Sequence, residues 1–236
     1  MKEIKVVLFD LDGTLLPVNT EEFLTYYLKM ISVKVANHME PEKFVRVLMS
    51  ATDAMINDLS DRTNEEVFME SFLPHFEGRS EELLEEIEQF YEQEFPKLRQ
   101  FTKDSDLSRE VVERVIESGR DVVIATNPVF PMRAIKERLK WVNVDKLPVK
   151  YITSYENMSY CKPQLEYYKQ IADKIKINPV NCLMVGNDAQ EDLIAREIGM
   201  KTYLVEDYLI DRSEGNYKTD YQGTLTQLSK FLQEKL

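Results

Sequence analysis

Along residues 17–96, apolar side chains recur every three to four positions, the spacing that places them on one face of a helix. One such stretch runs from Phe23 to Val35, and another follows Pro41, which suits a first helical turn. The sequence TNEE (Thr63–Glu66) has capping-box spacing ahead of a third stretch. A fourth, SEELLEEIEQFYEQEF, carries glutamates opposite its apolar face, as a solvated helix does. We therefore expect residues 17–96 to form an all-helical unit of about four helices.

From about residue 97 the pattern changes to short apolar runs that alternate with amphipathic helices. Alternation of helices with almost purely apolar strands is typical of a parallel sheet covered on both faces. The expected strands are Ile4–Phe9, Asp121–Thr126, Val149–Ser154, Asn181–Gly186 and Lys201–Asp207. The expected helices are Ser108–Ser118, Met132–Trp141, Leu165–Ile175 and Glu191–Ile198.

The predicted fold class is therefore α/β, a doubly wound parallel sheet with an inserted all-helical domain. The sheet domain comprises residues 1–16 and 97–236. The helical domain, residues 17–96, is inserted directly after the first strand.

Composition narrows the range of partners. The chain has 236 residues, of which 43% are hydrophobic and 31% charged, as in an ordinary soluble protein. Its net charge of −12, without a cluster of Lys and Arg, argues against nucleic acid and against anionic membrane surfaces. The N-terminus reaches charged residues too soon for a signal peptide, and no apolar run approaches the roughly 18 residues of a membrane span. We expect a cytoplasmic protein, either monomer or dimer.

Cys161 and Cys182 are the two cysteines of the chain. They form no CxxC motif and have no histidine nearby in the sequence, so they predict neither a zinc site nor a disulfide framework. We interpret them as small buried side chains in a reducing compartment.

Polar residues gather where the predicted strands end, and ligands of doubly wound sheets bind at the carboxyl ends of the strands. Each residue alone has an ordinary explanation, such as an Asp-Gly turn, a strand-end threonine, a surface lysine or acids at a helix N-terminus. Together and in this order they predict a functional site. These residues are Asp10, Asp12, Gly13, Thr126, Asn127, Lys162, Asn187, Asp188 and Asp192.

The chemistry of this set points to a metal and an anion. Carboxylates held close together need a compensating cation, and oxygen ligands without histidine or cysteine favour Mg²⁺. Lys162, the Thr126 hydroxyl and turn amides around Gly13 and Asn127 supply donors for an anion. A divalent metal, an anion receptor and a free carboxylate together describe phosphoryl transfer to an aspartate.

Four segments resemble the ordered motifs of the haloacid dehalogenase-like (HAD) hydrolase superfamily. They are FDLDGTLL, VVIATNP, CKP and VGNDAQEDLIAREIGMKTYLV, and they span the sheet domain from end to end. The helical insertion after the first motif is similar to the C1-type cap of that superfamily. The resemblance implies a Rossmann-like core and says little about the substrate.

The resemblance also implies residue roles. Asp10 would be the nucleophile and a ligand of Mg²⁺. Asp12 would be the general acid for the leaving group and then the base for water, and its backbone carbonyl would bind the metal. Lys162 would bridge the phosphate and Asp10, and spread the transition-state charge. Thr126 and the Asn127 amide would hold the phosphoryl oxygens.

Asp188 would complete the metal shell, with Asp192 supporting it directly, through water or through Lys162. One departure from the family pattern matters here. The family often has an aspartate directly after the glycine of the fourth motif, where this chain has Asn187. The spacing of four between Asp188 and Asp192 favours Asp188 as the ligand, and Asn187 stays open as the alternative.

Asp12 favours cleavage of a phosphate ester, because members that cleave phosphonates or carbon–halogen bonds need no acid to protonate an alkoxide. A cap of this size would admit a small phosphorylated metabolite and obstruct a folded phosphoprotein. We therefore expect Mg²⁺-dependent hydrolysis of a small phosphomonoester through an aspartyl-phosphate on Asp10. A phosphotransferase or sugar-phosphate mutase, and a non-catalytic phosphate-binding protein, stay open as alternatives. The polar candidates for contacting the leaving group are Arg46, Asn57 and Arg62, although we interpret each of them first as an ordinary surface residue.

Overall fold

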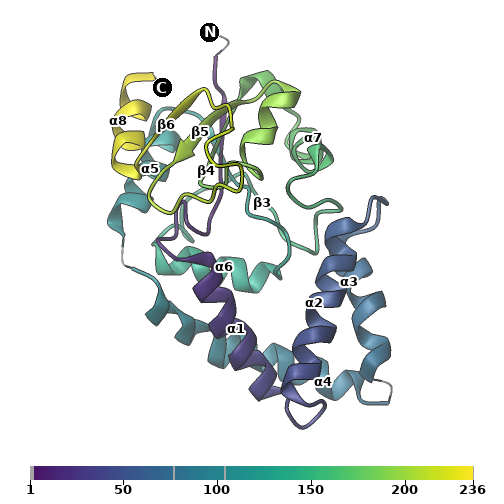
Figure 1. Ribbon diagram of the computed structural model, residues 1–236. Helices are drawn as coiled ribbons and strands as arrows, with labels where there is room; N and C mark the ends of the chain where they lie inside the picture. Colours follow the sequence, from purple (N-terminus) through teal and green to yellow (C-terminus); the bar gives the residue numbers. More distant parts are fainter. Residues whose placement is uncertain (1–2, 77, 104, 236) are drawn as a thin grey trace.

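The centre of the molecule is a six-stranded sheet in which every neighbouring pair of strands is parallel (Figure 1). The computed structural model describes residues 3–76, 78–103 and 105–235. The strand order is β3-β2-β1-β4-β5-β6, so the first strand lies in the middle. The strands are β1 (Val6–Phe9), β2 (Asp121–Ile124), β3 (Tyr151–Ile152), β4 (Cys182–Gly186), β5 (Lys201–Val205) and β6 (Tyr221–Gly223).

Helices cover both faces of this sheet, as the fold class predicts. They are α5 (Asp106–Glu117), α6 (Met132–Trp141), α7 (Leu165–Lys174) and α8 (Leu225–Lys235), with 3₁₀ turns at Pro179–Asn181 and Leu193–Ile198. Alternate residues of β1 point to opposite faces: Val7 and Phe9 pack in one apolar cluster with α5, α6 and α8, and Val6 and Leu8 in another with α7. The doubly wound parallel sheet is therefore confirmed.

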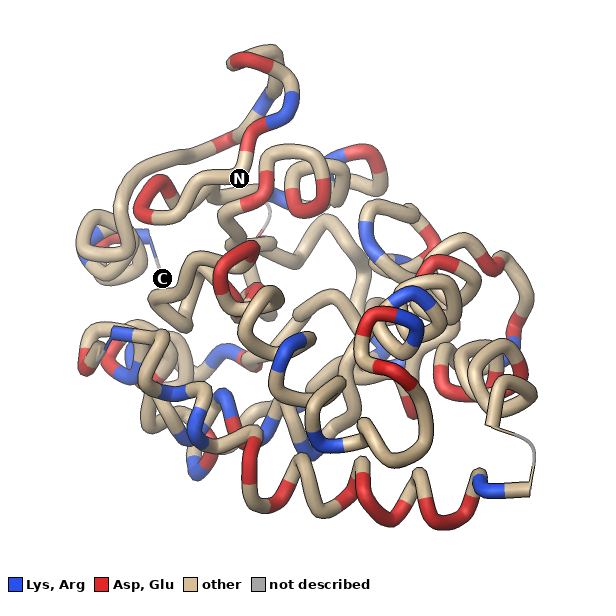
Figure 2. The backbone as a smooth tube through the Cα atoms, turned by 60° about the horizontal axis from the view of Figure 1, so that its bottom comes forward, with Lys and Arg blue, Asp and Glu red and all other residues tan. Residues whose placement is uncertain are grey.

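The described elements between β1 and α5 are helices and helical turns, and they lie below the sheet in Figure 1. Pro41 occupies the first turn of its helix, and Thr63 and Glu66 form both hydrogen bonds of the capping box. In Figure 2, acidic positions follow one another along the lower edge of the view, where the glutamate-rich α4 lies. The elements are α1 (Thr20–Lys34), α2 (Pro41–Asn57), α3 (Asn64–Phe72), a 3₁₀ turn at Leu73–Phe76, α4 (Ser80–Gln89), a π-helical turn at Phe90–Glu94 and a 3₁₀ helix at Phe95–Phe101.

An aromatic cluster joins the helical insertion to the sheet domain. Phe23 of α1 meets Trp141 of α6 edge-on, with ring centroids 6.3 Å apart. Phe95 stacks on the same indole at 5.7 Å. One apolar core thus runs from the sheet into the insertion, and the division of the chain at residues 16/17 and 96/97 stays a prediction.

The segment expected as a helix at Glu191–Ile198 is instead a turn followed by a 3₁₀ helix. The carboxylate of Asp188 accepts hydrogen bonds from the backbone amides of Gln190 and Glu191, both at 2.9 Å. Such side-chain bonds compete with the regular helical pattern, which explains the difference. β6 and α8 lie beyond the elements that the sequence predicts and continue the alternation to the C-terminal end.

The two cysteines and the apolar character of the helices can be compared with the expectations from the sequence. Cys161 and Cys182 are buried free thiols, and burial raises the pKa of each to about 12, which confirms their interpretation as buried side chains. Within the described ranges, no helix is long and apolar enough to cross a membrane.

Candidate active site

The loop after β1 carries the first two aspartates. Gly13 has a φ of +81°, and a Cβ at this position would lie 2.4 Å from the Asn187 side chain, so both conformation and space require glycine. The Gly13 amide donates to the Leu16 carbonyl at 2.8 Å. That amide is therefore used within the turn, and the phosphate contact predicted for Gly13 stays a prediction.

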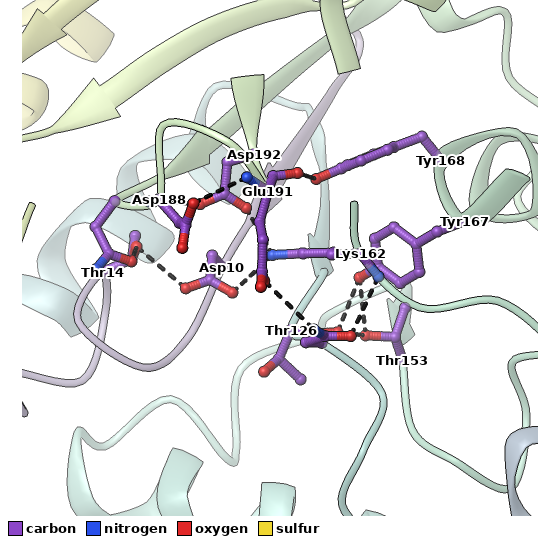
Figure 3. Close-up of polar contacts among 12 residues, drawn as sticks. Asp10, Thr14, Thr126, Thr153, Lys162, Tyr167, Tyr168, Asp188, Glu191 and Asp192 are labelled. Carbon is purple, nitrogen blue, oxygen red and sulfur yellow. Dashed lines mark hydrogen bonds and ion pairs between the residues drawn. The ribbon is translucent and has the colours of Figure 1, made fainter. Parts of the chain in front are cut away.

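Lys162 links two carboxylates at the centre of the site (Figure 3). Its Nζ donates to Asp10 Oδ1 at 2.8 Å and to Asp192 Oδ1 at 2.7 Å. Burial alone would lower the pKa of Lys162, but Asp10 and Asp192 outweigh it and raise the pKa well above its usual range. Lys162 is therefore a permanently charged cation beside the predicted nucleophile.

Asp10 lies under opposing influences. Burial raises its pKa, Lys162 lowers it, and the nearby Asp192 and Asp12 raise it again, with a net result of about 7. The Thr14 hydroxyl donates to Asp10 Oδ2 at 3.3 Å. Lys162 is shared between two buried carboxylates and does not fully compensate the negative charge on Asp10. A further cation near Asp10 would therefore be stabilised by the remaining negative charge.

Asp192 uses both of its oxygens within the protein. Oδ1 accepts from Lys162, and Oδ2 accepts from the backbone amide of Asp188 at 3.0 Å. Gly186 makes room for this carboxylate, since a Cβ there would lie 2.0 Å from Oδ2. Of the three ways in which Asp192 could support a metal, the geometry favours the one through Lys162.

Asn187 and Asp188 differ in what their side chains face. Asn187 Oδ1 accepts from the Thr14 hydroxyl at 2.9 Å, and its Nδ2 donates to the Tyr208 carbonyl at 2.7 Å. Asp188 Oδ2 accepts from the Arg212 guanidinium at 2.8 Å, and that arginine is largely exposed. This arrangement favours Asp188 as the oxygen ligand of a metal, because its cationic partner is an exposed side chain, whereas both polar atoms of Asn187 bond within the protein.

Asp12 is paired with Arg138 of α6, a partner that sequence reasoning missed. The arginine is fully buried and stacks over the Phe130 ring, with its guanidinium carbon 4.6 Å from the centroid. Arg138 lies on the same helix face as the buried Ala134, Ile135 and Leu139. A charged residue on an apolar helix face was the signal available in the sequence.

The loops that carry Thr126, Asn127 and Lys162 are bonded to one another. The Thr126 carbonyl accepts from the hydroxyls of Thr153 at 2.7 Å and Tyr167 at 2.9 Å. Asn127 Oδ1 accepts from the Lys162 backbone amide at 3.2 Å. These bonds fix the strand ends on which the predicted phosphate-binding residues stand.

A cavity of about 260 Å³ opens over these side chains. Its lining includes every predicted site residue except Gly13. The residues that we selected because they follow predicted strands therefore lie around one cavity. Its lining also includes Glu191, whose pKa burial raises to about 7, and Arg212, neither of which was predicted. The lining residues are Asp10, Asp12, Thr20, Phe23, Leu24, Thr126, Asn127, Val129, Phe130, Lys162, Asn187, Asp188, Glu191, Asp192, Ile210 and Arg212.

The donor set fits Mg²⁺ better than a transition metal. In the part of the chain that the structure describes, no three side chains of His, Cys, Asp or Glu form a ligand cluster. The predicted set is two carboxylates, those of Asp10 and Asp188, with the Asp12 carbonyl. These donors are all oxygens, which suit Mg²⁺ because it binds few protein oxygens and keeps several waters.

Comparison with known proteins decides the family. The family model for haloacid dehalogenase-like hydrolases matches residues 4–199. The chain belongs to the haloacid dehalogenase-like hydrolase family. A search of curated protein sequences gives no match.

Solved structures of similar fold span several activities of this hydrolase family. A HAD phosphatase from Thermococcus onnurineus has a TM-score of 0.60 at 20% identity, with 97% of this chain and 98% of that one covered. A putative beta-phosphoglucomutase from Thermotoga maritima has 0.58 at 19%, covering 99% and 100%. L-2-haloacid dehalogenase from Xanthobacter autotrophicus has 0.59 at 11%, with the same coverage. At these identities the likeness shows the fold alone.

Proposed function

We propose that this HAD-like hydrolase removes phosphate from a small phosphomonoester in the cytoplasm, with Asp10 as the nucleophile. The observation that carries the proposal is the grouping of Asp10, Lys162 and Asp12 around one cavity. A dehalogenase needs no acid for its leaving group, whereas an alkoxide must be protonated. The carboxyl of Asp12, two residues after the nucleophile, therefore favours a phosphate ester.

In the proposed reaction, an Asp10 oxygen attacks phosphorus and the bond from phosphorus to the ester oxygen breaks. Asp12, in its protonated form, gives its proton to that oxygen, and the alcohol leaves. Asp12 then takes a proton from water, whose oxygen attacks the phosphorus of the aspartyl-phosphate. The Asp10–phosphorus bond breaks, which releases phosphate and restores Asp10. Lys162 offsets the negative charge on the phosphoryl group in both steps.

Other residues hold the reacting groups in place. Thr126 and the Asn127 amide stand at the cavity wall as donors for the phosphoryl oxygens. Arg138 positions the Asp12 carboxylate. Asp10, Asp188 and the Asp12 carbonyl would hold Mg²⁺, which when bound neutralises charge on the transferring phosphoryl group.

The experiment measures phosphate release from p-nitrophenyl phosphate with Mg²⁺ and with EDTA, for the wild type and for Asp10→Asn. Asp53→Asn, an exposed change on α2, is the control. We expect turnover that needs Mg²⁺, is lost in Asp10→Asn and is retained in the control. Mass spectrometry of quenched enzyme should show phosphate on Asp10. Full activity of Asp10→Asn would refute the proposal.

A mutase would retain the phosphoryl group on Asp10 until the sugar phosphate rebinds. The two activities differ in the fate of the phosphoryl group, so a sugar phosphate used as substrate in place of p-nitrophenyl phosphate distinguishes them. Free phosphate accumulating at the rate of substrate loss supports the hydrolase, and isomerised phosphate ester without free phosphate supports the mutase.

A further inference from the structure

A second cavity, of about 270 Å³, adjoins the candidate active site and lies largely within the helical insertion. The two cavities share the side chains of Leu24, Asn127, Val129 and Phe130 as a common wall. Helices α1, α2, α3 and α4 provide most of the remaining lining. We call this space the helical cavity. A group attached to a phosphate at Asp10 would have to pass these shared side chains to enter it.

None of the described residues that line the helical cavity carries a charge. This is notable in a chain with 31% charged residues. Among its few polar groups, the hydroxyls of Tyr27 and Tyr91 bond to each other at 2.9 Å. Arg46, Asn57 and Arg62 are not among the described lining. The lining residues outside the common wall are Tyr27, Leu28, Ile31, Leu48, Met49, Thr52, Ile56, Phe68, Met69, Phe72, Leu84, Ile87, Tyr91, Pro131 and Tyr155.

The outer end of the helical cavity adjoins a more acidic hollow. That hollow shares Leu84 and five other lining residues with the helical cavity and adds Glu65, Glu85, Glu88 and Arg133. Arg133 is already paired with Glu88 at 2.9 Å. The remaining acids would repel a carboxylate or a second phosphate on the entering molecule.

We propose that the helical cavity binds the leaving group of the substrate, and that this group is uncharged and apolar. This inference rests on the proposed phosphatase function and names its substrate class. A charged leaving group would lose water without gaining an ionic partner, because the described lining offers it no cation. An alkyl or aryl group gains by leaving water for this surface.

The size of the helical cavity sets the scale of the group. Engineered apolar cavities of about 150 Å³ already take up benzene. A volume of about 270 Å³ therefore accommodates a substituted ring or a short alkyl chain. Phosphorylated acids and nucleotides fall outside this class.

The test is a series of n-alkyl phosphates from methyl to octyl, measured as kcat/KM with Mg²⁺. Members beyond ethyl share nearly the same leaving-group chemistry, so differences report binding in the helical cavity. We expect kcat/KM to rise about fourfold for each buried methylene and to stop rising once the cavity is full. Glycerol phosphate and phosphoglycolate should be poor substrates. A flat series, or preference for phosphoglycolate, would overturn the proposal.

Acetyl phosphate separates the two proposals, because it can phosphorylate Asp10 without filling the helical cavity. If acetyl phosphate and every ester fail, the phosphatase function itself fails. If acetyl phosphate is turned over and the alkyl series is flat, the inference about the leaving group alone fails.

Two variants test the location. Leu84→Glu places a charge in the helical cavity, and Leu59→Glu places the same charge on the exposed cap surface. We expect Leu84→Glu to lower kcat/KM for hexyl phosphate by about tenfold or more and to spare acetyl phosphate. Met69→Trp, which fills space without charge, should shorten the chain length at which the rise stops. Equal effects of Leu84→Glu and Leu59→Glu, or an unchanged limit in Met69→Trp, would contradict the location.

Discussion

The pair formed by Arg138 and Asp12 joins a buried cation of α6 to a carboxylate that reaches the cavity. The arginine side chain is fully buried, whereas the aspartate retains 17% of its side-chain exposure at the cavity. In the described part of the chain, one oxygen of Asp12 and one terminal nitrogen of Arg138 have no hydrogen-bond partner. Removing these two charged groups from water costs free energy. We therefore interpret Arg138 as a residue that positions the Asp12 carboxylate.

Arg138→Met should destabilise the protein strongly, because it leaves Asp12 without its cation and removes buried packing. The expected loss is about 3–5 kcal/mol, or roughly 10 °C in Tm for a chain of this size. Thermal unfolding measures it. Arg133→Met on the same helix is the matched control, because Arg133 is partly exposed and its pair with Glu88 is worth at most about 1 kcal/mol. Equal shifts for both variants would contradict the interpretation.

The raised pKa of Asp10 makes a prediction about pH in the absence of metal. Because the folded pKa is about 7 and the unfolded one 3.8, the folded protein holds this proton more tightly. The resulting stability is fully present below the unfolded pKa and is lost as pH rises through about 7. Replacing the carboxylate by a neutral amide should therefore stabilise the metal-free protein, and more at high pH.

The measurement is the Tm of Asp10→Asn relative to wild type in EDTA, at pH 5 and at pH 8. We expect a gain that grows from the lower to the higher pH. Asp121→Asn, an exposed aspartate paired with Lys150, should show no such growth. A gain of the same size at both values of pH would mean that Asp10 is not the titrating group.

At the scale of elements, the start of α3 connects the helical insertion to the sheet domain. Thr63 caps this helix, and the next residue, Asn64, donates from its backbone amide to the Met158 carbonyl at 2.7 Å. The same helix contributes Phe68, Met69 and Phe72 to the helical cavity. Its N-terminus is thus tied to the sheet domain while its apolar face lines the helical cavity.

Thr63→Ala removes the side-chain half of the capping box and should cost about 1 kcal/mol of unfolding free energy. Thr63→Ser keeps the hydroxyl and should cost clearly less. Urea denaturation of the two variants, compared with wild type, measures the difference. Indistinguishable midpoints for Thr63→Ala and Thr63→Ser would show that the Thr63 hydroxyl at the start of α3 contributes nothing to stability.

Local patterns were sufficient for the elements whose signals lie within one segment. Met132–Trp141 is predicted to the residue, and the capping box at Thr63 forms as expected. The turn after β4 was mispredicted because the Asp188 side chain bonds to the backbone, which periodicity does not reveal. Arg138 and Arg212 were missed because their partners are distant in sequence and meet them only in the folded chain.

At the scale of the whole molecule, neither the net charge nor the side chains of the site supply a free positive charge for a phosphate ester. A net charge of −12 gives no long-range attraction for a phosphate ester. Among the described residues that line the active-site cavity, the cations are Lys162 and Arg212, and both are already paired with carboxylates. Binding of the proposed phosphate ester would therefore require a further positive charge at the site, which the predicted Mg²⁺ would provide.

Mg²⁺ should raise the Tm of the wild-type protein. A ligand that binds only the folded state stabilises it by about 2.7 kcal/mol at about 100 times its Kd, which corresponds to roughly 5–10 °C here. An acidic protein also attracts divalent cations without a specific site, so the shift alone does not locate the metal.

Asp188→Asn removes a predicted ligand, and Asp53→Asn removes one surface charge of the same kind. If the metal binds at the ends of β1 and β4, the shift is largely lost in Asp188→Asn and retained in Asp53→Asn. Equal shifts in both variants would assign the effect to the acidic surface and leave the site without its metal.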